Sequence, residues 1–245
     1  MAPMFYRSLS LVLLLSLSTL SSAQINLGQA GDIAKKLGLG TSLTDSNISA
    51  GLKQALQIGA ENSVQLVGRK DGYFGNAAIR ILMPRNLQSL EKSLRVVGYG
   101  PKIDDFDLSM NRAAEAAAPA ARQIFVDAIT AMSFDDARNI LSGGDTAATD
   151  YFKEKTTPQL TAAFRPVVDR TMAQNGVTKQ YNALVKQYKS IPFTKNQDLD
   201  ITNYVVAKAL DGLFYEVGEE ERKIRQDPAK QTTALLKEVF GHGRR

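Results

Sequence analysis

Residues 205–217, VVAKALDGLFYEV, carry the pattern that decides the fold. Apolar residues recur in this stretch at the three- and four-residue spacing of an α-helix. They are Val205, Val206, Ala209, Leu210, Leu213, Phe214 and Val217. Such a broad apolar stripe is typical of a helix in the middle of a bundle, and Asp200 precedes it as a candidate N-cap. We therefore predict an all-α protein built around this helix.

The same helical spacing returns along most of the chain. It predicts an amphipathic helix over residues 48–67 and further helices over 87–97 and 104–118. A helix over 228–240 is expected to pack against the outside of the central one. Because no Pro-, Gly- or Ser-rich linker divides residues 44–241, we predict a single-domain bundle of about eight to ten helices.

Short local signals mark where several helices begin. Ser133 and Asp136 have the spacing of a capping box, in which the two side chains satisfy each other's backbone N–H groups. Asp145 or Thr146 is a candidate cap for the next helix. Pro158 follows a threonine and is expected to be the first residue of another helix.

One stretch departs from the helical pattern. Residues 69–86, RKDGYFGNAAIRILMPRN, contain the turn dipeptides Asp-Gly and Gly-Asn and end near Pro84. Residues 77–83 have the apolar content of a short strand, but no second strand is predicted to pair with it. We therefore expect an irregular loop that packs against the bundle.

The first 23 residues have the layout of a cleavable signal peptide. A positive charge at Arg7 precedes an apolar run over 9–20, and Ser21 to Ala23 supply small residues for cleavage. The run is too short for a stable membrane-spanning helix, although an uncleaved anchor is the alternative. We expect an exported protein, periplasmic or secreted, with no transmembrane segment after cleavage. Residues 24–43 are then a flexible N-terminal segment and 242–245 a tail.

Composition excludes several kinds of chemistry. The chain has no cysteine, so disulfides, a lipoprotein anchor and thiolate metal sites are ruled out. Its single histidine, His242, lies close to the chain end, where it is a poor candidate for a catalytic base or a metal ligand. The net charge of +5 is not gathered into a basic stripe interleaved with aromatics, so no nucleic-acid partner is expected. No catalytic, metal or cofactor motif is present.

Three polar residues stand out in an alanine-rich helix. Asn111, Arg112 and Glu115 lie among Ala113, Ala114 and Ala116 to Ala118, and so many alanines indicate close packing on more than one side. Partly enclosed polar groups need partners, and Arg112 and Glu115 are spaced to pair with each other. We interpret the three residues as a buried structural network, or alternatively as a contact for a ligand or partner.

Asp145 is the other candidate binding residue. It follows Gly143 and Gly144 and precedes a predicted helix, where exposed backbone N–H groups can receive an anion. The carboxylate of Asp145 would itself occupy these donors and repel a second negative charge. A plain helix–helix turn is therefore the competing interpretation.

Several segments read together resemble a known family. They are DGYFGNAAIRILMP (71–84), FDLSMNRAAEAAAP (106–119), ILSGGDTAATDYFKEKT (140–156), ALDGLF (209–214) and EEERKIRQDPAKQTTALLKEVFG (219–241). In this order they are similar to the domain-of-unknown-function family numbered 4197, whose members are mostly exported bacterial proteins. The resemblance implies a helical exported domain with no established activity, so it assigns no catalytic residue.

Three functional hypotheses follow. The first is a non-enzymatic protein that binds an apolar or amphipathic ligand, or an envelope protein partner. The second is an enzyme that uses carboxylates and arginine, with Glu115 or Asp145 acting beside Arg112 in a shared cleft. The third is a self-associating scaffold of the cell envelope.

Overall fold

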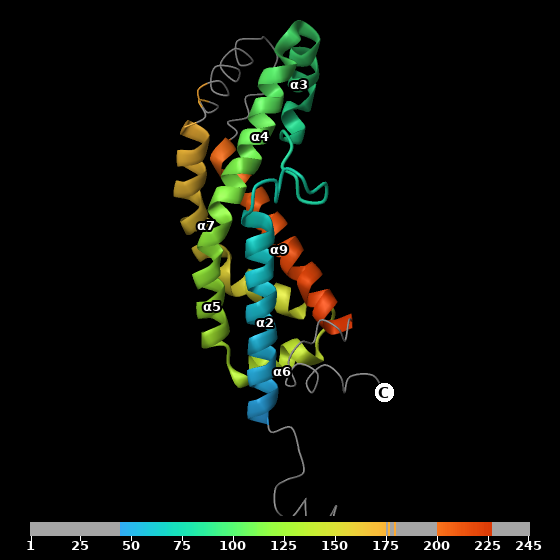
Figure 1. Cartoon of the computed structure of the whole chain (residues 1–245), viewed down its shortest axis with the longest axis vertical. Helices are drawn as coiled ribbons and strands as arrows, with labels where there is room; N and C mark the ends of the chain where they lie inside the picture. The colour runs from blue at the N-terminus through green and yellow to red at the C-terminus, as the bar shows by residue number, and fades with distance from the viewer. Residues whose placement is uncertain (1–44, 175, 177–178, 180–199, 227–245) are drawn as a thin grey trace, which may run out of the picture. The chain divides into compact units, whose positions relative to one another are not determined.

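The computed structural model describes residues 45–174, 176, 179 and 200–226. Several sequence predictions lie outside these residues: the signal peptide 1–23, the segment 24–43, the helix over 228–240 and the tail 242–245. Regular structure in the described part of the chain is entirely helical, which confirms the all-α prediction (Figure 1).

The longer α-helices are α2 (Asp45–Gly68), α4 (Gly100–Ala117), α5 (Ala121–Ala131), α7 (Ala147–Gln174) and α9 (Ile201–Gln226). Two shorter ones, α3 (Gln88–Leu94) and α6 (Phe134–Ser142), join them. The segments η1 (Arg85–Leu87) and η3 (Ala118–Ala120) are single turns of 3₁₀ helix. The segment η2 (Arg95–Tyr99) is a π-type turn between α3 and α4. The predicted capping box is present: the Ser133 hydroxyl accepts from the Asp136 N–H, and the Asp136 carboxylate accepts from the Ser133 N–H.

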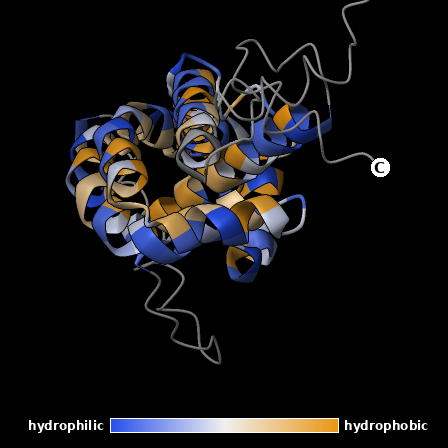
Figure 2. Ribbon diagram, turned by 90° about the horizontal axis from the view of Figure 1, so that it is seen from below, coloured by the Kyte–Doolittle hydropathy of each residue, from blue (hydrophilic) through white to orange (hydrophobic). Residues whose placement is uncertain are grey.

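The α9 helix lies at the centre, as its broad apolar stripe predicts. It packs against α2, α4 and α7, and all seven residues of the predicted stripe are buried. Figure 2 shows apolar residues turned toward the space that the helices share and polar residues turned outward. Helix α4 packs against α7, α9 and α2, and its Ala113, Ala114 and Ala117 are fully buried.

The prediction of eight to ten helices is wrong, since the described residues contain only the five longer and two shorter α-helices. One reason is that Pro158 does not begin a helix but lies inside α7, as does Pro166. Both prolines are on the solvent side, where water can hydrate the carbonyl groups that lose their hydrogen bonds. The inward side of α7 is continuous through both prolines: it consists of Ala148, Phe152, Thr156, Leu160, Phe164, Val168 and Met172.

Residues 69–84 form the irregular packed loop that the sequence predicts. We call residues 69–84 the anchored loop. Tyr73 is its deepest side chain and is fully buried. Its ring lies against Gly212 of α9, where an added Cβ would come within 2.6 Å of Tyr73 Cε1 and 3.1 Å of Ile79 Cβ. Only a glycine lets the loop approach α9 this closely.

We predict that Gly212→Ala destabilises the fold, although alanine is the better helix former by about 1 kcal/mol. The new methyl group would displace the Tyr73 ring, and overpacking of this kind costs about 1–3 kcal/mol. Chemical denaturation followed by circular dichroism measures the change. Gly144→Ala is the control, because nothing lies within 4 Å of its added Cβ; equal stability of the two variants would contradict the prediction.

No helix in the described part of the chain is both long enough and apolar enough to cross a bilayer.

Candidate functional site

Asn111 of α4 forms hydrogen bonds to the C-terminal part of the anchored loop, at Ile81. Its Oδ1 accepts from the Ile81 N–H at 2.8 Å, and its Nδ2 donates to the Ile81 carbonyl at 2.8 Å. The Nδ2 group also donates to the Asp107 carbonyl at 2.7 Å. The amide therefore satisfies both backbone groups of Ile81, much as a neighbouring strand would. Asn111 is fully buried, so these bonds form away from competing water.

Glu115 and Arg112 form hydrogen bonds to the N-terminal part of the same loop, at residues 71–74. Glu115 Oε1 accepts from the N–H groups of Tyr73 at 3.1 Å and Phe74 at 3.2 Å. Its Oε2 accepts from Arg112 Nη1 at 2.5 Å, and Arg112 Nη2 reaches Asp71 Oδ1 at 2.6 Å. Both oxygens of Glu115 are thus bonded, and the pairing of Arg112 with Glu115 is the one that their spacing predicts.

Three further bonds join the anchored loop to α9, one of them from the Tyr204 hydroxyl to the Leu82 carbonyl at 2.8 Å. Tyr73 donates its hydroxyl to the Ala209 carbonyl at 2.6 Å, and Asn76 Nδ2 donates to Glu216 Oε1 at 2.7 Å. Burial, followed by the nearby charges of Glu216 and Glu115, raises the pKa of Tyr73 far above its usual value. The Tyr73 phenol therefore remains a hydrogen-bond donor at any physiological pH. The loop is held from α4 on one side and from α9 on the other.

An open groove of about 410 Å³ lies between the anchored loop, the start of α3 and α9. We call this the loop groove. Its loop wall includes Arg80, Leu82 and Met83, followed by Arg85 of η1. Its α9 wall consists of Tyr204, Lys208, Asp211, Gly212 and Tyr215. Apolar and aromatic side chains thus alternate with cationic ones around a single depression.

The charges of the loop groove are unevenly neutralised. Lys208 Nζ pairs with Asp211 at 2.8 Å, whereas neither Arg80 nor Arg85 forms an ion pair with another described residue. The Arg80 guanidinium stacks over the Phe74 ring, 4.0 Å from its centroid. Leu82 and Tyr215 remain 53% and 45% exposed. The groove therefore offers, beside exposed apolar surface, two guanidinium groups that no carboxylate in the described part of the chain neutralises.

A buried carboxyl group lies close to this groove. Asp107 is only 7% exposed, and its Oδ1 finds no hydrogen-bond partner among the residues that the structure describes. Burial, with a further contribution from the negative charge of Glu91, raises the pKa of Asp107 to about 6. Burial raises the pKa of the Tyr204 phenol in the groove wall; the positive charge of Lys208 opposes this, and the nearby charge of Asp107 adds a smaller rise.

We predict that Asp107→Asn stabilises the protein at pH 7.5 by about 2–3 kcal/mol, the free energy equivalent of the raised pKa. Because the pKa of the folded state lies above that of the unfolded state, the wild-type carboxyl binds protons more tightly when folded. Its penalty is therefore full above pH 6 and declines as pH falls from about 6 to 4. Denaturation at several pH values measures the difference between the variants. A stability gain that persists unchanged at pH 4 would contradict this account.

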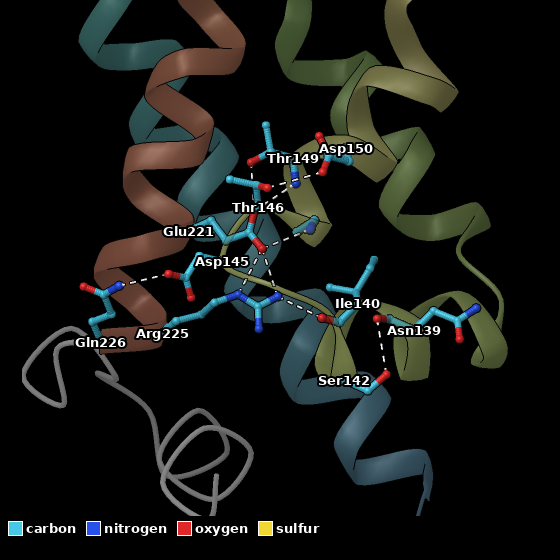
Figure 3. A network of polar contacts seen from close by, with 11 residues as sticks. Asn139, Ile140, Ser142, Asp145, Thr146, Thr149, Asp150, Glu221, Arg225 and Gln226 are labelled. Atoms are coloured by element: carbon cyan, nitrogen blue, oxygen red, sulfur yellow. Dashed lines mark hydrogen bonds and ion pairs between the residues drawn. The ribbon is translucent and has the colours of Figure 1, made fainter. Parts of the chain in front are cut away.

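Asp145 lies elsewhere, at the turn between α6 and α7 (Figure 3). Its Oδ2 accepts from Gln226 Nε2 at 3.3 Å. Gln226 follows Glu216, the α9 partner of the anchored loop, by ten residues, or about 15 Å along the helix axis. The structure therefore brings Asn111, Arg112 and Glu115 together and leaves Asp145 apart from them.

The buried carboxylate at the α6–α7 turn is Glu221 of α9 (Figure 3). Its Oε1 accepts from the Ala148 N–H at 3.0 Å, and its Oε2 accepts from the Thr149 N–H at 2.9 Å and from the Thr149 hydroxyl at 2.8 Å. These N–H groups belong to the first turn of α7, where a negative charge is favoured. A side chain from another helix thus performs the capping that the sequence assigned to Asp145 or Thr146.

Arg225 completes this network from the next turn of α9. Its guanidinium bonds Glu221 Oε1 at 2.9–3.0 Å and donates to the Ile140 carbonyl at 2.8 Å. Ile140 lies in the last turn of α6, and its carbonyl accepts from the Gly143 N–H at 3.3 Å as well as from Arg225. Glu221 and Arg225 therefore cap α7 and α6 together. Sequence reasoning missed both residues, and the available signal was their four-residue spacing in a segment with several acidic neighbours.

The backbone donors expected to receive an external anion are consequently occupied by the protein itself. We predict that Glu221→Gln lowers the free energy of unfolding by about 2–4 kcal/mol, since the amide NH₂ would face donors and leave them unpaired. Glu219→Gln is the matched control: Glu219 pairs with Arg222 at the surface, so about 0–1 kcal/mol is expected. Thermal or chemical denaturation distinguishes them, and similar losses would refute the internal cap.

A second groove, of about 620 Å³, lies between α2 and α5. Its base includes Ile58, Phe125 and Ile129, and its rim carries the amides of Gln54, Gln57, Asn62 and Gln123. Its two charged residues neutralise each other, because Arg122 Nε lies 2.7 Å from Glu61 Oε2. Its two charged residues are therefore paired with each other.

Among the described residues, no group of three or more His, Asp or Glu side chains is placed to hold a metal ion.

These features define a class of protein: an all-α bundle whose inward polar residues fix a buried loop and helix ends, with an open groove beside the loop. The chain belongs to the family described as Protein of unknown function (DUF4197), whose model matches residues 42–241. This confirms the family resemblance of the sequence. No curated protein and no solved structure was found to match the chain.

Proposed function

We propose that this protein is an exported, non-enzymatic binding protein, and that the loop groove receives an anionic amphiphile. The amphiphile would have an acidic head group and an apolar chain. The single observation that carries the proposal is a pair of guanidinium groups, Arg80 and Arg85, that form no ion pair within the described residues and lie beside exposed Leu82 and Tyr215.

The chemistry of the groove supports this ligand class. Arginine binds carboxylate and phosphate oxygens through two parallel N–H bonds, and such charge-assisted bonds are stronger than neutral ones. Leu82, Met83 and Tyr215 supply the apolar contact that an alkyl chain requires. A cationic ligand would meet only Asp211, which is already paired with Lys208.

The anchoring of the loop supports a binding role for the groove. Asn111 and Glu115 fix the backbone at Ile81 and Tyr73, on either side of the chain that carries Arg80. A wall held in this way loses little conformational entropy when a ligand binds. We therefore assign Asn111, Arg112 and Glu115 to positioning the groove wall rather than to touching the ligand.

The alternatives receive less support. The enzyme hypothesis needs Arg112 beside a carboxylate in a shared cleft, but both Glu115 oxygens bond the protein and Asp145 lies at another turn. The α2–α5 groove is larger, yet its charges are internally paired. Self-association remains the third hypothesis, and light scattering on the mature chain tests it directly. The signal-peptide pattern of residues 1–23 supports export.

We predict that decyl phosphate binds the purified protein below its micelle concentration, and that Arg80→Gln and Arg85→Gln each weaken binding about tenfold or more. Isothermal titration calorimetry measures the dissociation constants. Arg122→Gln, on the α2–α5 groove, is the matched control and should bind as the wild type does.

Two comparisons make the test decisive. Decanol lacks the negative charge and decyltrimethylammonium reverses it, so both should bind more weakly than decyl phosphate. Equal binding of all three, or an equal loss in Arg122→Gln, would refute the loop groove as the site.

A further inference from the structure

The turn between α3 and α4 exposes a group of apolar side chains. Val96, Val97 and Tyr99 are 86%, 66% and 42% exposed, and Gly98 stands between them. We call residues 96–99 the hairpin tip. Large contiguous apolar patches on a protein surface mark contacts with a partner or a membrane.

The hairpin tip has a defined shape. Gly98 has a φ of 90°, a left-handed conformation that glycine adopts without strain. Behind it, Arg95 bonds Glu91 of α3 and Asp104 of α4, each at 2.9 Å. This guanidinium bridges the two helices of the hairpin at the base of the tip. The valines are therefore presented on a braced turn.

Charged side chains of both signs lie close to the tip in sequence. Lys92 and Lys102 flank the tip and form no ion pair with another described residue. Lys102 Nζ lies 5.1 Å from the centroid of the Tyr99 ring. Acidic side chains are close to these lysines in sequence: Glu91 precedes Lys92, and Asp104 and Asp105 follow Lys102 on α4. Arg95 engages two of them, Glu91 and Asp104.

We infer that the hairpin tip docks on an anionic lipid surface. Val96 and Val97 would enter the boundary between head groups and acyl chains, Tyr99 would lie at head-group level, and the two lysines would contact lipid phosphates. This inference does not depend on the proposed ligand of the loop groove.

The size and position of the tip favour lipid over a protein partner. A stable protein interface covers about 800 Å² on each side, which a turn of four residues cannot supply. The tip is a projecting turn at the end of the bundle opposite α6 (Figure 1), and its residues line neither the loop groove nor the α2–α5 groove. A projecting apolar turn with basic neighbours instead suits shallow insertion among lipid head groups.

We predict that the full mature protein sediments with phosphatidylcholine vesicles that contain phosphatidylglycerol, and that Val96→Asp/Val97→Asp lowers the partition coefficient about tenfold or more. Phe134→Asp is the matched control, since Phe134 is also exposed but lies on α6, and it should partition as the wild type does. Partitioning should also weaken as salt screens the lysines. Circular dichroism confirms that each variant is folded.

Fluorescence locates the point of insertion. The chain has no tryptophan, so Val96→Trp provides a unique probe, and Phe134→Trp provides the same probe at the other end. Only the tip probe should shift to shorter wavelength and be quenched by bromine-labelled lipid. Equal binding by all variants, insertion reported from Phe134→Trp, or equal binding to vesicles without phosphatidylglycerol would overturn the inference. So would dimerisation that requires the valines without any binding to vesicles.

Discussion

The burial of α9 on three sides is the constraint on which the rest of the structure depends. Because α2, α4 and α7 enclose this helix, its acidic residues cannot all reach water. The Glu221 carboxylate accepts hydrogen bonds from N–H groups in the first turn of α7, and the Glu216 carboxylate accepts one from the Asn76 side-chain amide. A buried carboxylate without such partners would be very costly. The α6–α7 turn and the anchored loop are therefore both tied to α9.

The anchored loop has residues that face the helix bundle and residues that line the loop groove. Tyr73 and Ile81 turn toward α4 and α9 and are fully bonded or buried, whereas Arg80 and Leu82 turn outward to the loop groove. Alternation of this kind makes an irregular segment rigid without a partner strand. A rigid wall that carries unpaired charge is the physical basis of the proposed binding role, and the hairpin tip is a separate surface with a different chemistry.

Sequence reasoning succeeded where the signal was local. The helix over 48–67, the capping box at Ser133 and the irregular loop are all present, because spacing and turn residues act over a few positions. The pairing of Arg112 with Glu115 was also foreseeable from their spacing. The start predicted at Pro158 failed because a proline on the outer side of a long buried helix can be hydrated, and sequence alone did not show which side it faced.

The sequence by itself determined that the chain is helical, which helix is central and which stretch is irregular, since periodic apolar residues dictate what each segment buries. It also determined family membership. Tertiary structure alone decided that Glu221 and Arg225, rather than Asp145, cap the α6–α7 turn, and that Arg80 and Arg85 share a groove with Tyr215. These contacts join residues far apart in the chain, and their partners are set by how the helices cross rather than by any spacing along one of them.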